Sequence, residues 1–307
     1  VIVLAALREA FGQLGNPAWT ALAARIVPED LRGRYFSART FLMTMAALVV
    51  APLAGRLIAS YRGVEGYQIS LGLAFVAGLL ASWSYSRIPV PSESQRQPTD
   101  EFPLLDVLRR LPEHRAFLRF CLVSIVLNLS VQIAGPFFNV YLVRGLGADA
   151  GFVGIFTTIS TAATLAGTRL LGPLLDQRGL RWMMARTSPF IALIPLGWAF
   201  VYEPWQVVPI GIMANLAWAG YNLAIFNYLL ASTPGDQRPL YSAIYNTGNA
   251  LTLVVGPLIG GLLYDTWGFR AALMASCTGR SCAALMIFLL LPEVGRRLRQ
   301  PGLGSRE

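Results

Sequence analysis

The chain has 307 residues, of which 55% are hydrophobic and 13% are charged, and its mean hydropathy is +0.53. That composition is too apolar for a soluble domain of this length. All 25 basic residues are arginines, and we interpret the formal net charge of +9 first as a determinant of membrane orientation, not as a nucleic-acid-binding surface.

Nine apolar runs are long enough to cross a bilayer, which takes about 20 residues. They cover residues 1–27, 36–60, 67–88, 116–143, 151–175, 181–202, 205–231, 240–264 and 269–291. Backbone groups in lipid must be satisfied within their own segment, so each run is predicted to be a helix. The runs do not alternate as the strands of a membrane barrel do. The predicted fold class is therefore an all-α membrane protein with nine transmembrane helices.

The first run carries two charged residues, Arg8 and Glu9, together with Gln13 and Asn16. Burying an acid inside a membrane span is costly enough to indicate a function. Arg8 lies near one end of the run, however, where a long side chain can reach the interface. Two interpretations remain open here, a functional pair and an interfacial pair that anchors the helix end.

Residues 16–58 and 222–263 resemble each other. Asn16-Pro-Ala corresponds to Asn222-Leu-Ala, and Pro28-Glu-Asp-Leu-Arg corresponds to Pro234-Gly-Asp-Gln-Arg at the same offset of 206 residues. A duplicated pair of spans is typical of transporters built from repeats. The offset matches the first span with the seventh, so both copies cross in the same direction. The last six runs then form a complete unit and the first three a partial one, and we expect three further spans upstream of residue 1 in the natural protein.

A polar stretch, residues 89–115, separates the third run from the fourth. Arginines are concentrated in this stretch, in every second loop and after residue 291, whereas the other loops hold only Arg62, Arg144 and Arg270. The positive-inside rule therefore places the C-terminus in the cytoplasm of a protein of the plasma membrane. The predicted organisation is a partial N-terminal transmembrane bundle at 1–88, a cytoplasmic linker at 89–115, a six-helix bundle at 116–291 and a cytoplasmic tail at 292–307.

The loop between the fifth and sixth runs reads Gly172-Pro-Leu-Leu-Asp176-Gln-Arg178-Gly179-Leu-Arg181. It resembles motif A of the major facilitator superfamily, although a glutamine stands where that family often has arginine. Gly172 would let a neighbouring helix approach, and Gly179 would permit a tight turn. Asp176 would face the positive N-terminus of a helix, while Arg178 and Arg181 would bind headgroups or helix C-termini. The alternative is an ordinary basic loop.

This resemblance covers essentially the whole chain and implies two six-helix bundles around a central cavity, working by alternating access. It assigns the motif at 172–181 to the gate between the bundles. Leu4, Arg8 and Gly12 resemble motif B of drug/proton antiporters, in which the arginine is linked to proton movement, although Phe11 replaces the usual polar residue. Arg8 and Glu9 are therefore the candidates for proton coupling.

Gly256-Pro-Leu-Ile-Gly260 resembles the GPxxG core of the antiporter motif. The family carries that motif in the earlier repeat, where this chain has Ala51-Pro-Leu-Ala-Gly55. Small residues at this spacing otherwise allow close helix packing and a kink at proline. This segment therefore leaves the antiporter interpretation open.

Neutral amides and aromatic residues lie within several spans. Asn128 and Gln132 are four residues apart and share a helical face, and so do Trp218 and Asn222. By resemblance, four cavity-lining helices of the family carry the candidate set Asn16, Asn128, Gln132, Trp218, Asn222, Asn246 and Asn249. Amides together with Tyr221 and Tyr245 suit a neutral or amphipathic organic solute. Each amide taken singly could instead join two helices through a hydrogen bond.

These features predict a secondary transporter of a small organic solute, with protons as the coupling ion that the resemblance implies. No GxxxxGK[ST] pattern occurs, which argues against ATP-driven pumping by this chain. No catalytic residue, metal or cofactor is expected, and the partners are the solute and the lipid bilayer, not nucleic acid. The alternatives are a membrane enzyme and a non-transporting sensor on the same scaffold. Arg280, midway along the last run, has no explanation at this level.

Overall fold

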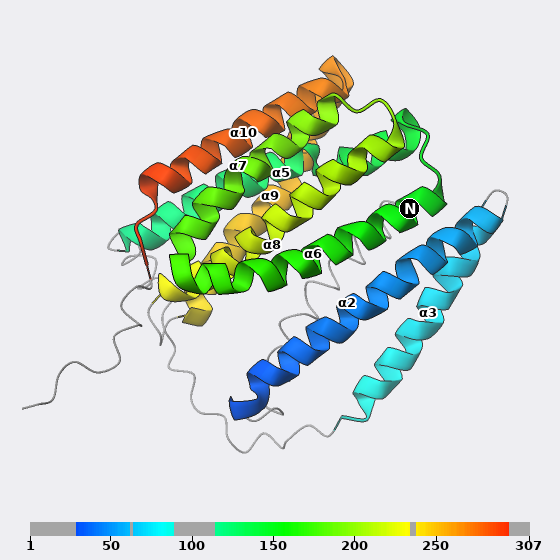
Figure 1. Cartoon of the computed structure of the whole chain (residues 1–307), viewed down its shortest axis with the longest axis horizontal. Helices are drawn as coiled ribbons and strands as arrows, with labels where there is room; N and C mark the ends of the chain where they lie inside the picture. The colour runs from blue at the N-terminus through cyan, green and yellow to red at the C-terminus, as the bar shows by residue number, and fades with distance from the viewer. Residues whose placement is uncertain (1–28, 62–63, 89–113, 234–237, 295–307) are drawn as a thin grey trace, which may run out of the picture. The chain divides into compact units, whose positions relative to one another are not determined.

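The computed structural model describes residues 29–61, 64–88, 114–233 and 238–294, which form helices joined by turns (Figure 1). Strands are absent from these described ranges. The chain divides into two compact units, Val1–Glu101 and Phe102–Glu307, and each is described by itself.

Seven helices of the described residues are long and apolar enough to cross a membrane. They correspond to the second to fifth and the seventh to ninth predicted runs. The run at 181–202 also forms a helix, α7 (Leu180–Ala199), but it carries Arg181 and Arg186 and is not among the seven. The run at 1–27 lies outside the described residues. A multi-pass helical membrane protein is therefore confirmed, whereas the count of nine spans is not.

The first unit contains a pair of helices, α2 (Glu29–Ser60) and α3 (Glu65–Ser86). They meet closely at Gly66, where a Cβ atom would lie 2.8 Å from the Cα atom of Ile58. A side chain at this position would therefore push the start of α3 away from the end of α2. Most of the large apolar side chains of this pair are exposed, for example Leu71 and Phe75, as is common for helices that face lipid or other helices.

The second unit contains the remaining helices. They are α5 (Arg115–Val140) with its π-helical extension η2 (Tyr141–Gly145), α6 (Ala150–Arg178), α7, the short η3 (Pro204–Gln206), α8 (Val207–Ala231), α9 (Arg238–Trp267) and α10 (Phe269–Leu290). Two of its junctions are single glycines with positive φ, Gly179 at 94° and Gly268 at 81°. Glycine adopts such angles without the steric cost that other residues meet, so both reversals are compact.

The packing of this unit is an ordered series of helix pairs. The main neighbours are α6 with α8, α8 with α7, α7 with α10, α10 with α5, and α5 with α9. We call the two outer pairs the α6–α8 seam and the α5–α9 seam; α7 and α10 connect them. The core lies around these connectors and includes Phe117, Phe120, Met183, Met184 and Ile191, each at most 1% exposed. α7 is thus surrounded by protein along much of its length, which explains how it tolerates a lower hydropathy than its neighbours.

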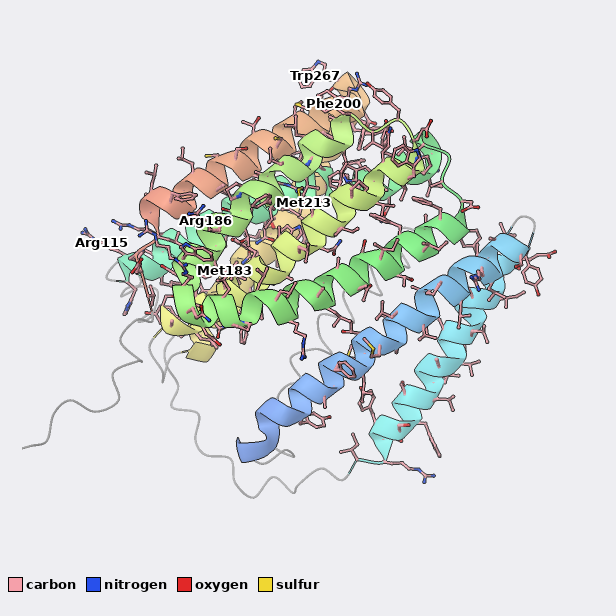
Figure 2. The ribbon with its side chains drawn as sticks, viewed as in Figure 1. Arg115, Met183, Arg186, Phe200, Met213 and Trp267 are labelled. Atoms are coloured by element: carbon pink, nitrogen blue, oxygen red, sulfur yellow. The ribbon has the colours of Figure 1, made fainter. Side chains whose placement is uncertain are left out.

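The two ends of this unit differ in the number of arginines that they carry. Figure 2 shows Arg115 and Arg186 at one end and Phe200 and Trp267 at the other. Arg119, Arg178 and Arg181 belong to the first end, because α5 and α7 begin there and α6 ends there. Only Arg144 and Arg270 lie at the second end among the described residues. We call these the arginine-rich end and the arginine-poor end.

Candidate functional site

The α5–α9 seam is built on small residues of α9. A Cβ atom at Gly256 would collide with the side chain and backbone of Gln132, and one at Gly260 would collide with the backbone of Ile133. The backbones of α5 and α9 therefore approach each other at the spacing that the GPxxG-like segment provides. This agrees with the packing interpretation of that segment.

Two predicted cavity residues meet across this seam. The Nδ2 atom of Asn128 donates a hydrogen bond to the Oδ1 atom of Asn249 at 2.7 Å, and a second one to the carbonyl oxygen of Ser124 at 3.0 Å. Asn249 in turn donates from Nδ2 to the carbonyl oxygen of Tyr245 at 2.9 Å. Both amino groups are therefore satisfied, whereas the Oδ1 atom of Asn128 accepts no hydrogen bond from a described residue. The pair joins two helices and still offers an acceptor.

Aromatic rings extend this pair towards α8. Tyr245 stacks on Phe120 with ring centroids 5.3 Å apart, and Phe120 stacks on Tyr228 at 5.0 Å. Tyr221 contacts Trp218 edge-on at 5.8 Å, and Tyr221 belongs to the same packed core as Phe120 and Tyr228, against which Tyr245 also packs. We call Asn128, Asn249, Tyr245, Tyr221 and Trp218 the amide–aromatic cluster. It links α5, α8 and α9 and contains three of the predicted cavity residues.

The other predicted amides of the second unit lie outside this network. Gln132 is half-buried against Gly256, while Asn222 and Asn246 are exposed on α8 and α9. None of these three side chains forms a hydrogen bond with a described residue. An unpaired amide on a membrane-spanning helix is costly when lipid surrounds it. These positions therefore fit a polar environment better than a lipid-facing one.

The α6–α8 seam has its own polar contact. Thr164 donates to the Oδ1 atom of Asn215 at 3.1 Å, and Asn215 donates to the carbonyl oxygen of Gly211 at 2.8 Å. A Cβ atom at Gly167 would lie 2.9 Å from that of Ala219, so the two helices are closely packed. Asn215 therefore joins α6 to α8 through a hydrogen bond. This is the alternative that the sequence left open for each amide.

The motif at 172–181 forms the junction between α6 and α7. Gly179 has the positive φ expected for a tight turn. Arg181 donates from Nη2 to the carbonyl oxygen of Phe288 at 2.8 Å, near the C-terminus of α10, where cations are favoured. Arg178 and Arg186 lie over Trp182, with guanidinium carbons 5.6 and 5.7 Å from the ring centroid. The junction is thus fixed to α10 from within its own unit.

The remaining predicted site residues are Gly172, Asp176 and the residues of the first run. A Cβ atom at Gly172 would meet no described atom within 4 Å, so the helix approach expected there does not occur within the described residues. Asp176 is exposed on the last turn of α6. Arg8, Glu9 and Asn16 lie outside the described residues.

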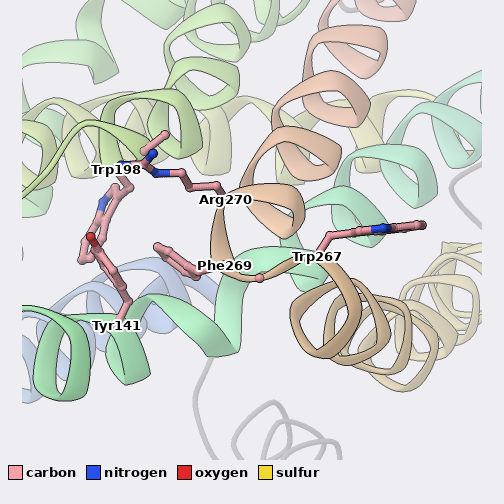
Figure 3. Close-up of a pocket in the computed structure, with 7 residues that line it drawn as sticks. Tyr141, Trp198, Trp267, Phe269 and Arg270 are labelled. Carbon is pink, nitrogen blue, oxygen red and sulfur yellow. The ribbon is translucent and has the colours of Figure 1, made fainter.

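A pocket of about 330 Å³ opens at the arginine-poor end (Figure 3). Its lining comes from η2, the last turn of α7 and the turn between α9 and α10: Tyr141, Trp198, Ala199, Trp267, Gly268, Phe269 and Arg270. Figure 3 shows Tyr141, Trp198 and Phe269 together and the side chain of Arg270 extending towards Trp198. None of the predicted cavity residues lines this pocket. It is therefore separate from the amide–aromatic cluster.

The match of this chain to a known protein family identifies its class. The family model for the Major Facilitator Superfamily matches two segments, residues 1–129 and 120–305, which together cover nearly the whole chain. The chain belongs to the Major Facilitator Superfamily. It is accordingly a membrane transporter and not an enzyme.

Individual members of the superfamily are also similar to this chain. The multidrug resistance protein MdtG of Escherichia fergusonii is 25% identical over 324 residues, covering 96% of this chain and 72% of the relative. The proteins of the same name from Salmonella dublin and Salmonella typhimurium are each 24% identical over 288 residues, covering 86% of this chain and 66% of the relative. The chain thus spans about two thirds to three quarters of the length of these relatives.

The sequence analysis did not single out two aromatic residues that lie in the core of the second unit, Phe120 and Tyr228. Tyr221 and Tyr228 are seven residues apart, two helical turns, and so lie on one face of α8. That spacing is a usable signal for an aromatic stripe. Phe120 carries no comparable signal, because its partners are about a hundred residues away in the chain.

Proposed function

We propose that this protein is a secondary transporter that moves a small amphipathic organic solute across the plasma membrane by alternating access. The observation that carries the proposal is the amide–aromatic cluster, in which Asn249 joins Asn128 to Tyr245 and the Oδ1 atom of Asn128 accepts no hydrogen bond from a described residue. Neutral amides supply directional hydrogen bonds, and aromatic faces supply apolar contact area. Such a lining recognises a solute with an apolar body and few polar groups.

The helices that carry the cluster support the same proposal. α7 and α10 connect the two seams, so α5, α6, α8 and α9 are the helices left to face a central cavity. Gln132, Asn222 and Asn246 lie on three of the four helices α5, α6, α8 and α9, and their amides have no described partner. We assign these amides, with Asn128, Asn249 and Trp218, to the solute pathway. Asn16 is assigned to it by resemblance alone.

The relatives are named for multidrug resistance, and this name supports a proposal about the class of solute. We propose export of lipophilic organic compounds, coupled to proton entry. Arg8 and Glu9 are the proposed coupling residues, and the junction at Gly172, Asp176, Arg178, Gly179 and Arg181 is the proposed gate at the cytoplasmic side. The arginine-rich end and the C-terminus are then cytoplasmic, in accord with the positive-inside rule.

Dye efflux from cells that express the natural protein tests the proposal. Asn222→Ala and Asn246→Ala should each raise the apparent KM for a lipophilic dye by roughly 3- to 10-fold, the loss expected for one hydrogen bond to the solute. The matched control is Asn227→Ala. This asparagine is also exposed on α8, but it lies nine residues from Trp218, about 180° around the helix.

The outcomes separate the transporter from the remaining alternative. Efflux that depends on the protein, with a raised KM in the two variants and an unchanged KM in Asn227→Ala, supports the proposal. Equal effects of all three substitutions would remove the assignment of Asn222 and Asn246. No efflux and no uptake of any compound in sealed vesicles, from well-expressed protein, would favour a non-transporting sensor.

A further inference from the structure

A buried arginine in α10 plays no part in the cluster or the gate. Arg280 lies eleven residues after the start of α10, about 16 Å along a helix of 22 residues, and only 2% of its surface is exposed. No described carboxylate forms an ion pair with it. A charged side chain at this depth is expensive unless its donors are used, so its contacts indicate a specific task.

The principal contact of Arg280 is with a backbone carbonyl of α7. Its Nη1 atom donates a hydrogen bond to the carbonyl oxygen of Ile191 at 3.2 Å. Its guanidinium carbon also lies 6.0 Å from the ring centroid of Phe138. The Nε atom has no described partner. The side chain therefore reaches from one connector helix to the other.

The carbonyl that Arg280 binds is one that a proline leaves without a donor. In an α-helix the carbonyl of residue 191 accepts from the N–H group of residue 195. Residue 195 is Pro195, inside α7, and proline has no N–H group. Because other groups must satisfy a carbonyl freed in this way within a membrane, the position of Arg280 has a physical reason.

We infer that Arg280 supplies the hydrogen bond that Pro195 cannot, and so links α7 to α10 at the position where α7 lacks a backbone hydrogen bond of its own. The end of α7 after Pro195 also contacts α5 and η2. Phe138 packs on Trp198 at 4.8 Å, and the Tyr141 hydroxyl donates to the carbonyl oxygen of Val201 at 3.0 Å. The Arg280–Ile191 link therefore keeps the connector between the two seams rigid where its own helix is weakened. This inference does not depend on which solute is transported.

A double-mutant cycle tests the link. Arg280→Met removes the donor while keeping a long side chain, and should lower the Tm of the purified full-length protein by about 5 °C, since a buried carbonyl loses its partner. Pro195→Ala restores an N–H group to residue 195. In the Pro195→Ala background the same Arg280→Met change should lower the Tm by less than half as much. Pro189→Ala is the matched control, because it restores a different hydrogen bond of the same helix.

Hydrogen exchange locates the effect. In Arg280→Met the amides of residues 190–203 should exchange faster, whereas in Pro195→Ala/Arg280→Met they should exchange as in Pro195→Ala. Equal losses of Tm in all three backgrounds would overturn the inference, as would unchanged exchange in this segment. If Arg280→Met alone yields no folded protein, recovery in the Pro195→Ala background but not in Pro189→Ala supports the link, and recovery in neither or both contradicts it.

Discussion

At the scale of single residues, two adjacent glycines of α9 have opposite environments. A Cβ atom at Gly260 would overlap the backbone of Ile133, which cannot move aside without shifting α5. A Cβ atom at Gly261 would meet only the ring of Phe137, at an ordinary contact distance of 4.0 Å. The close approach of α5 and α9 therefore depends on Gly260 and not on its neighbour.

Gly260→Ala should destabilise the protein by about 1–3 kcal/mol, because the added methyl group forces the two backbones apart. Gly261→Ala is the control and should leave the free energy of unfolding within about 0.5 kcal/mol of the natural protein. Thermal unfolding in detergent, followed by intrinsic tryptophan fluorescence, measures both. Equal stability of the two variants would show that α5 and α9 do not pack as closely as described.

At the scale of helices, the reversal between α6 and α7 depends on one backbone conformation. Gly179 has φ of 94° and ψ of 168°, a region that residues with a Cβ atom rarely adopt. The reversal also brings Arg181 to the end of α10, where it binds the carbonyl oxygen of Phe288. The turn and the link to α10 are therefore coupled, since a wider turn would move Arg181.

Gly179→Ala should cost about 1–3 kcal/mol of stability through backbone strain. Gly172→Ala in the same motif should cost none within this bundle, because its Cβ atom would enter open space among the described residues. Chemical unfolding of both variants in detergent gives the comparison. A neutral Gly179→Ala variant would mean that the turn readily adopts another conformation, and it would remove the strain argument.

At the scale of helices, the sequence predicted some features of the structure and could not predict others. Apolar runs predicted the helices, and local spacing predicted the turn at Gly179, because both depend on residues close together in the chain. The partner of Arg280 could not be predicted. Pro195 shows in the sequence that Ile191 needs a donor, but the order in which the helices pack decides which side chain reaches it. The pairing of Asn128 with Asn249 has the same cause, since it joins residues 121 positions apart.

At the scale of the molecule, the distribution of arginine predicts orientation. The described residues of the second unit place Arg115, Arg119, Arg178, Arg181 and Arg186 at one end and Arg144 and Arg270 at the other. Loops with more arginine stay in the cytoplasm because positive residues resist translocation. The helix bounds bring the first five of these arginines, although far apart in the sequence, to the same end of one packed unit, and Figure 2 shows Arg115 and Arg186 there.

Cysteine labelling at the two ends tests this orientation. After Cys121, Cys277 and Cys282 are replaced by alanine, a single cysteine is introduced as Gln177→Cys or Tyr202→Cys, both of which are exposed positions at opposite ends. An impermeant maleimide added to intact cells should label the cysteine at 202 and should reach the one at 177 only after the membrane is permeabilised. Each position is the control for the other, since both are turn-proximal and solvent-accessible in detergent. Labelling of position 177 from outside, with protection of position 202, would invert the topology and place the junction at 172–181 on the wrong side for a cytoplasmic gate.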